Sequence, residues 1–153
     1  MSIFLNDPPC LDAVTNQLLS SSKVGEIKVS SNDVAFASLA ALLGEMYFCY
    51  WLIQGDGFDV TGWIIKDYLR CLAVVDDGVF SDLARWGRAL HDRRGEALAF
   101  KKNSGRYVGN YNYRSLHELT RRSDLVLMRG LGINSKAALG TFDEMQRVLS
   151  VNR

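Results

Sequence analysis

The sequence predicts an all-α, or mainly α, domain of about five to seven helices that spans residues 1–153. Three observations lead to this expectation. The 153 residues suffice for one core, the composition is that of an ordinary globular protein (48% hydrophobic, 23% charged), and apolar residues recur at helical spacing along most of the chain. The pattern leaves room for one short β-hairpin. A subdivision into a helical core over residues 1–100 and a C-terminal unit over residues 113–153 stays open.

The N-terminal segment predicts a short first helix, because apolar residues follow Pro8 and Pro9 at helical spacing over residues 11–19. The alternating stretch Lys23–Val29 forms a strand only if Arg106–Val108 pairs with it. The first residues lack the basic start and the long apolar run of a secretory signal. With 3 widely spaced cysteines, this predicts a reduced, cytoplasmic protein.

The longest apolar segment, Val34–Ile53, contains a single charged residue, Glu45. Its length matches a transmembrane helix, but a carboxylate near the centre of such a helix costs on the order of 3 kcal/mol. We therefore expect one central core helix, capped at residues 31–33, and no membrane contact. Glu45 should be at least partly buried and should meet a basic group or hydrogen bonds.

The rest of the chain continues in helical periodicity with one interruption. A third helix is expected over Thr61–Val75 and a fourth over Phe80–Phe100, with an irregularity at Gly95. The glycines and asparagines of Lys101–Tyr113 indicate a loop. Two further helices are expected after it, with Ser123–Asp124 as a cap and first-turn acid.

The charges divide along the chain although the net charge is only +1. Residues 1–84 hold 4 basic and 11 acidic side chains, whereas residues 85–129 hold 11 basic and 4 acidic ones. One interpretation is a face for phosphates or for an acidic partner protein. The other is that the basic segment packs against the acidic N-terminal half. The basic side chains are Arg85, Arg88, Arg93, Arg94, Lys101, Lys102, Arg106, Arg114, Arg121, Arg122 and Arg129.

A glycine turn, Gly130-Leu131-Gly132, separates the last two expected helices. It looks like a helix-hairpin-helix motif, in which glycines allow close approach and amides at the start of the next helix hold a DNA phosphate. With the preceding helix, residues 113–151 resemble the C-terminal domain of the bacterial RNA polymerase alpha subunit, except that Gly140 interrupts the last helix. The alternative is ordinary C-cap chemistry.

The resemblance implies binding to the DNA minor groove and to partner proteins. The candidate nucleic-acid-binding residues, drawn from this segment and from the basic residues before it, are Arg121, Arg122, Arg129, Gly130, Gly132, Asn134, Ser135, Lys136, Arg106 and Arg114.

Basic and aromatic side chains also alternate in Arg106–Tyr107 and in Tyr111–Arg114. Such a composition is suited to stacking unpaired bases. The same pattern fits an edge strand whose tyrosines pack into the core, so both interpretations stay open.

Signals for catalysis are weak. His91 and His117 lie at no metal-ligand spacing from each other or from a cysteine. Asp76, Asp77 and Asp82 could bind magnesium, but turn and cap roles explain them as well. No phosphate-binding loop or dinucleotide fingerprint is present. We expect no enzyme, no cofactor and no metal.

Two functional hypotheses follow. The first is a non-catalytic nucleic-acid-associated helical module that binds the phosphate backbone through the basic segment and the glycine turn. The second is a small protein–protein interaction module without nucleic-acid contact, such as an inhibitor, immunity or regulatory protein of a bacterial or phage system.

Overall fold

The structure, a computed structural model, describes residues 9–19, 27–55 and 60–151. Within these ranges the protein is mainly helical, as predicted, and carries a four-stranded antiparallel sheet that exceeds the one short hairpin expected. The elements are β1 (Cys10–Asp12), β2 (Leu18–Leu19), α1 (Asn32–Leu42), α2 (Glu45–Gln54), α3 (Gly62–Tyr68), a 3-10 helix (Leu69–Ala73), α4 (Asp77–Asp92), a 3-10 helix (Arg94–Ala97), β3 (Leu98–Asn103), β4 (Arg106–Tyr111), a 3-10 helix (Tyr113–Leu116), α5 (His117–Gly130) and α6 (Ser135–Val151).

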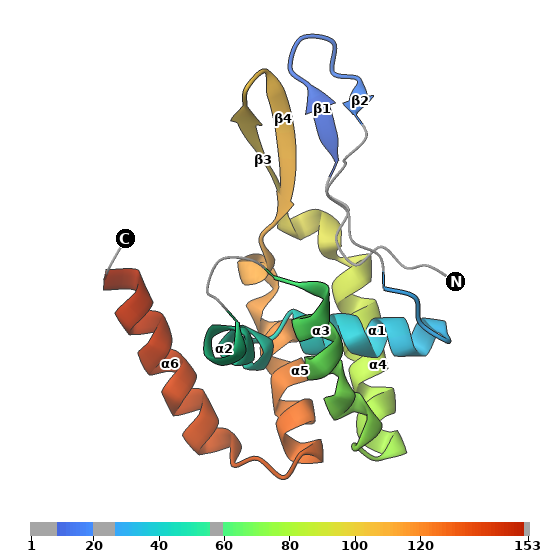
Figure 1. Ribbon diagram of the computed structural model, residues 1–153, viewed down its shortest axis with the longest axis vertical. Helices are drawn as coiled ribbons and strands as arrows, with labels where there is room; N and C mark the ends of the chain where they lie inside the picture. The colour runs from blue at the N-terminus through green and yellow to red at the C-terminus, as the bar shows by residue number, and fades with distance from the viewer. Residues whose placement is uncertain (1–8, 20–26, 56–59, 152–153) are drawn as a thin grey trace.

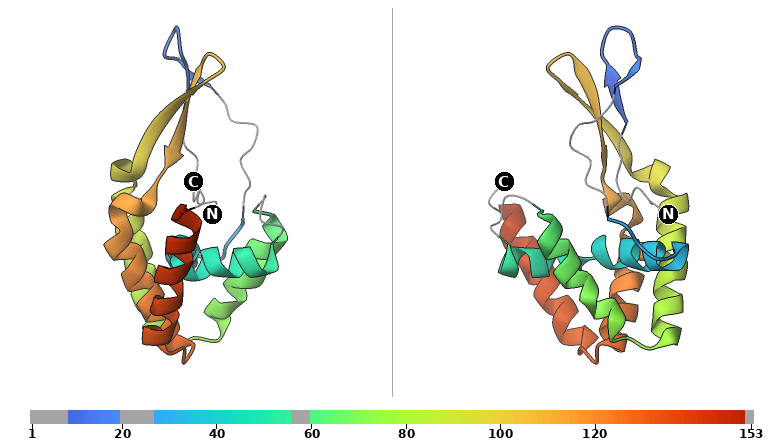
Figure 2. Two further views of the ribbon diagram at one scale, coloured as in Figure 1. Left: turned by 90° about the vertical axis from the view of Figure 1, so that its left-hand side faces the viewer. Right: turned by 45° about the vertical axis from the view of Figure 1, so that its right-hand side comes forward.

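The helices form a body from which the sheet projects at one end (Figures 1 and 2). The strand order is β2-β1-β4-β3, with all pairs antiparallel. The turn between α5 and α6 lies at the opposite end of the body (Figure 1). The long strands β3 and β4 project from the body beside the β1–β2 hairpin (Figure 1), and we call this pair, Leu98–Tyr111, the ribbon.

The core of the body lies where α1 crosses α4 and α5. Its buried members are Phe36, Ala37, Ala40, Ala41, Tyr68, Val79, Leu83, Ala84 and Leu127. Gly87 of α4 lets α1 approach closely, because a Cβ atom there would clash with the backbone carbonyl of Phe36. A second cluster holds the base of the ribbon against the body and consists of Leu39, Leu90, Ala97 and Leu116.

The expected first helix is wrong, because residues 11–19 belong to β1, a turn and β2. The carboxylate of Asp12 accepts hydrogen bonds from the amides of Val14 (2.9 Å) and Thr15 (2.8 Å), which closes the turn. β1 pairs with β4, and Cys10 lies opposite Val108. Arg106–Val108 therefore pairs with β1, and most of Lys23–Val29, the partner expected for it, lies outside the described residues.

The expected single helix over Val34–Ile53 is two helices, α1 and α2, with a 71° bend between them. α1 is buried as predicted, whereas no residue of α2 is fully buried. Ser31 caps α1 as expected, accepting a hydrogen bond from the amide of Val34 at 3.2 Å. No single helix among the described residues is long and apolar enough to cross a membrane, although the bent pair passes that test on length and composition.

The fourth helix ends at Asp92, and the expected loop Lys101–Tyr113 is largely strand. The 3-10 turn around Gly95 stops the helix, so Leu98 and Phe100 lie on β3. β3 and β4 form a hairpin closed by the two-residue turn Ser104–Gly105.

Two expectations about the last helices are also wrong. Ser123 and Asp124 do not begin a helix, because α5 runs through both and buries them. Gly140 does not interrupt α6, which is continuous from Ser135 to Val151.

Candidate nucleic-acid interface

Most arginines on the helices are paired with acids of the same chain. Arg88 pairs with Asp33 at 3.2 Å, and Arg129 pairs with Asp82 at 3.1 Å. Both acids belong to the acidic N-terminal half, so part of the basic segment neutralises that half. Arg85 likewise pairs with Asp82, and Arg93 pairs with Glu96 within its own turn.

Arg121 joins α5 to α2 and α6. Its guanidinium lies 3.9 Å from the carboxylate of Glu45 and 3.4 Å from that of Asp143. The side chain of Glu45 is 26% exposed, which confirms that it is partly buried and meets a basic group. Arg121 is therefore a bridge between helices and is poorly placed for a phosphate.

Arg122 lies on another side of α5, against Trp86 of α4. Its guanidinium is 5.3 Å from the centre of the indole ring, and that of Arg85 is 5.2 Å away. Each cation is within the range of a cation–π contact. Arg122 stays exposed and can still contact an anion.

The glycine turn ends α5 with a Schellman motif. The amide of Ile133 donates to the carbonyl of Met128 at 2.8 Å, and that of Gly132 donates to Arg129 at 3.2 Å. Gly132 has φ of +67°, which its lack of a side chain permits. Two amides of the turn are thus occupied by carbonyls of α5, which is the C-cap chemistry considered as the alternative.

The start of α6 offers less than the motif predicts. Asn134 caps this helix by accepting a hydrogen bond from the amide of Ala137 at 3.2 Å. The amides of Ser135 and Lys136 have no acceptor within α6 by helix geometry, and the Lys136 side chain is exposed. Gly130 faces α4, because a Cβ atom there would lie 2.6 Å from a methyl group of Val79.

The candidate residues do not form one site. Arg106 is near the tip of the ribbon and Arg114 lies in the 3-10 helix after β4, whereas Arg129 and Lys136 flank the turn at the opposite end (Figure 1). Arg121 and Arg122 lie between these ends on α5.

The ribbon carries cations that no carboxylate in the described part of the chain pairs with. Lys101 and Lys102 are exposed, and neither forms an ion pair with a described residue. Arg106 is exposed and lies opposite Asp12 in the sheet. Amides of Thr15 and Val14, with a smaller contribution from Arg106, lower the pKa of Asp12. The ribbon therefore keeps an excess of positive charge.

The aromatic residues of this region divide into two groups. Tyr111 and Tyr113 pack against the cluster at the ribbon base, and burial raises the pKa of Tyr113. These two tyrosines pack into the core as the alternative interpretation expects, but the expected edge strand is wrong, because β4 lies between β1 and β3. Tyr107 is partly buried further out, and Phe100 is 46% exposed.

Sequence reasoning missed Phe100 as a surface residue because it placed this residue on a helix. The sequence does contain a signal for a β-hairpin here: two six-residue runs flank a two-residue turn, Ser104–Gly105. The runs are Leu98–Asn103 and Arg106–Tyr111.

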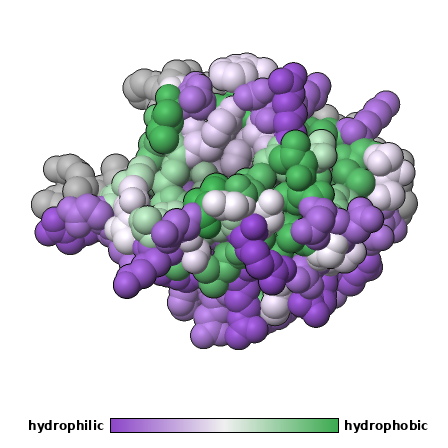
Figure 3. Space-filling model, turned by 90° about the horizontal axis from the view of Figure 1, so that it is seen from below, coloured by the Kyte–Doolittle hydropathy of each residue, from purple (hydrophilic) through white to green (hydrophobic). Residues whose placement is uncertain are grey.

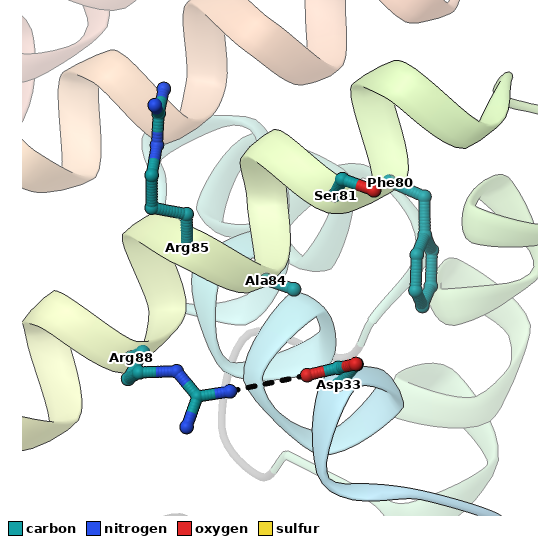
Figure 4. A pocket seen from close by; sticks show the side chains of 6 residues that line it. All are labelled: Asp33, Phe80, Ser81, Ala84, Arg85 and Arg88. Atoms are coloured by element: carbon teal, nitrogen blue, oxygen red, sulfur yellow. Dashed lines mark hydrogen bonds and ion pairs between the residues drawn. The ribbon is translucent and has the colours of Figure 1, made fainter.

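A shallow depression of about 250 Å³ lies between α1 and α4. Its lining residues are Asp33, Phe80, Ser81, Ala84, Arg85 and Arg88. Figure 4 shows Arg88 reaching across to Asp33 while Arg85 points away. Because Arg88 is already paired and also packs 4.4 Å above the ring of Phe36, the depression is a poor anion site.

The helical body also exposes large apolar side chains. Figure 3 shows apolar surface across the end away from the ribbon. The exposed apolar residues on and around α2 and α3 are Phe48, Ile53, Val60, Trp63 and Val74.

Comparisons of the chain with known proteins identify no relative. No family model matches the chain, and searches of curated proteins and of solved structures give no significant match.

Proposed function

We propose that this protein is a non-catalytic nucleic-acid-associated helical module whose main phosphate contact is the projecting ribbon. The observation that carries the proposal is the contrast between two sets of cations. Arg88, Arg121 and Arg129 are paired within the fold, whereas Lys101 and Lys102 extend from a β-hairpin without a carboxylate partner among the described residues.

Unpaired lysines on a projecting element suit contact with a phosphate backbone. Each phosphate that they neutralise releases condensed counterions, so binding is independent of sequence and weakens with salt. Arg106 near the tip and Arg114 at the base extend the same positive surface. Lys136 and the first amides of α6 form a second, smaller contact region that the resemblance favours.

Two variants with the same loss of charge test which end binds. Lys101→Gln with Lys102→Gln removes two charges from the ribbon, and Arg129→Gln with Lys136→Gln removes two from the turn. We expect the ribbon variant to weaken binding to single strands and to duplex by about tenfold or more. The affinity of the turn variant should stay within about twofold of wild type, since Arg129 already forms an ion pair with Asp82.

The turn variant is also the control for folding, because Asp82 keeps Arg85 as a partner when Arg129 is lost. Equal melting temperatures of the two variants would assign the difference to binding. Loss of affinity in the turn variant alone would move the contact to the glycine turn.

The second candidate is a protein interaction module. Trp63 is 59% exposed and Ile53 is 75% exposed, and exposed apolar side chains that gather on one region are typical of docking surfaces. A partner protein that is captured by wild type and by the ribbon variant, but lost with Trp63→Lys, would favour this function.

A further inference from the structure

We infer that one side of the ribbon binds single-stranded nucleic acid by stacking bases on Phe100 and Tyr107, with Lys102 beside them for the phosphates. This inference rests on the proposed function and adds the form of nucleic acid that the ribbon takes.

The strand register places these three side chains on the same side of the sheet. Residues that lie opposite each other in an antiparallel pair project to the same side, and successive residues alternate. Lys102 lies opposite Tyr107, and Phe100, two residues before Lys102, lies opposite Gly109. We call the side defined by Phe100, Lys102 and Tyr107 the aromatic side.

The two rings are diagonal neighbours on adjacent strands. Such positions are about 7–8 Å apart at the backbone, which long and aromatic side chains span. Gly109, opposite Phe100, has no side chain, and Pro9 occupies the space that one would fill, with its carbonyl oxygen 2.7 Å from the ideal Cβ position. Phe100 is 46% exposed beside it. Two aromatic rings on neighbouring strands of a sheet are a recurrent platform for consecutive unpaired bases.

The outer part of the aromatic side carries exposed side chains, Phe100 and Lys102. The described helices lie below the ribbon in both views, and none covers its outer half (Figures 1 and 2). Leu18 of β2 pairs with Leu11 of β1, which pairs with Tyr107, so Leu18 extends the apolar surface and is 73% exposed. Such a surface on a projecting sheet calls for a ligand with apolar faces.

Charge selects the ligand. Lys102 shares the aromatic side, while Lys101 and Arg106 project to the other side close to the tip. Asp12 is the acid that the sheet places among them. A polyanion with exposed flat rings matches this combination, and only unpaired nucleotides have it, because the bases of a duplex are stacked on each other.

The test compares three fluorescent probes of roughly 12 nucleotides: a deoxythymidine strand, an abasic strand with the same phosphates, and a duplex. Wild type should bind the deoxythymidine strand more tightly than either other probe. Phe100→Leu should weaken binding of that strand by about 5- to 150-fold and leave the abasic and duplex probes unchanged. Val108→Ala, on the other side of the sheet, is the matched control and should leave all three affinities unchanged.

The outcomes separate this inference from the proposed function. Equal affinities of wild type for the three probes, or a Phe100→Leu variant that binds the deoxythymidine strand as wild type does, would overturn stacking while the phosphate contact stands. Absence of binding to every probe would overturn both. The comparison of deoxythymidine and abasic strands needs no variant, so it holds even if a substitution disturbs the ribbon.

Discussion

The carboxylate of Asp124, in the middle of α5, accepts a hydrogen bond from the backbone amide of Glu45 at 2.7 Å. It also faces the amide of Met46 at 3.4 Å, so an acid on one helix caps the first turn of another. Asp124 is 1% exposed. This contact is what allows the chain to break between α1 and α2, because it satisfies amides that a continuous helix would have satisfied itself.

The first prediction concerns pH. Burial raises the pKa of Asp124 from 3.8 to about 7, against the lowering effect of the amides of Glu45 and Met46. Because the folded pKa is above the unfolded one, the folded state holds the extra proton between these values, and this group's contribution to stability falls as pH rises through that window. The difference corresponds to on the order of 4 kcal/mol.

Replacement by asparagine should remove this dependence. Urea unfolding of wild type and of Asp124→Asn between about pH 4 and pH 7 should show a difference that changes steadily with pH. Asp143→Asn is the control, because it removes a charge from an exposed position beside Arg121, which also acts on Asp124. A difference between wild type and Asp124→Asn that stays constant over the window would show that Asp124 titrates normally.

The second prediction concerns Gly44, which precedes α2. A Cβ atom at this position would overlap the carboxylate of Asp124, with the carboxyl carbon only 2.7 Å away. Gly44→Ala should therefore displace the cap and reduce the free energy of unfolding by about 1–3 kcal/mol. Gly62→Ala, at the first residue of α3 with open space around it, is the matched control and should be neutral or stabilising. Equal stabilities of the two variants would contradict the capping contact.

The third prediction concerns two glycines within helices. Gly87→Ala should destabilise the protein by about 2 kcal/mol or more, because the new methyl group meets the backbone carbonyl of Phe36, which cannot rotate away. Gly140→Ala in α6 meets nothing and should stabilise by about 0.5–1 kcal/mol through helix propensity. Thermal unfolding of both variants checks the pair, and stabilisation by Gly87→Ala would exclude the close crossing of α1 and α4.

The sequence predicted those elements whose signals are local. The sequence predicts a cap at Ser31 and a turn or cap role as one explanation of Asp76, and each side chain accepts a hydrogen bond from the amide three residues later. The break between α1 and α2 was not predictable from local pattern, since its cap comes from Asp124, 79 residues away from Glu45.

The sheet and the candidate site depended on long-range contacts in the same way. β1 joins β4 across almost a hundred residues of chain, and its segment alone has helical periodicity. The basic residues of the segment could be counted in advance. Tertiary contacts such as that of Arg88 with Asp33 decide which of them stay unpaired. The sequence therefore pointed to the glycine turn as the phosphate contact, whereas in the described part of the structure the ribbon lysines are the ones without ion pairs.

The central claim is that ribbon lysines contact phosphates, and a salt series tests it most directly. The logarithm of the binding constant for a duplex should fall linearly with the logarithm of salt concentration. Lys101→Gln with Lys102→Gln should reduce this slope by about 2, while Arg129→Gln with Lys136→Gln should reduce it by about 1 at most, through Lys136. A wild-type protein without salt-dependent affinity for single strands or duplex at low ionic strength would contradict the claim.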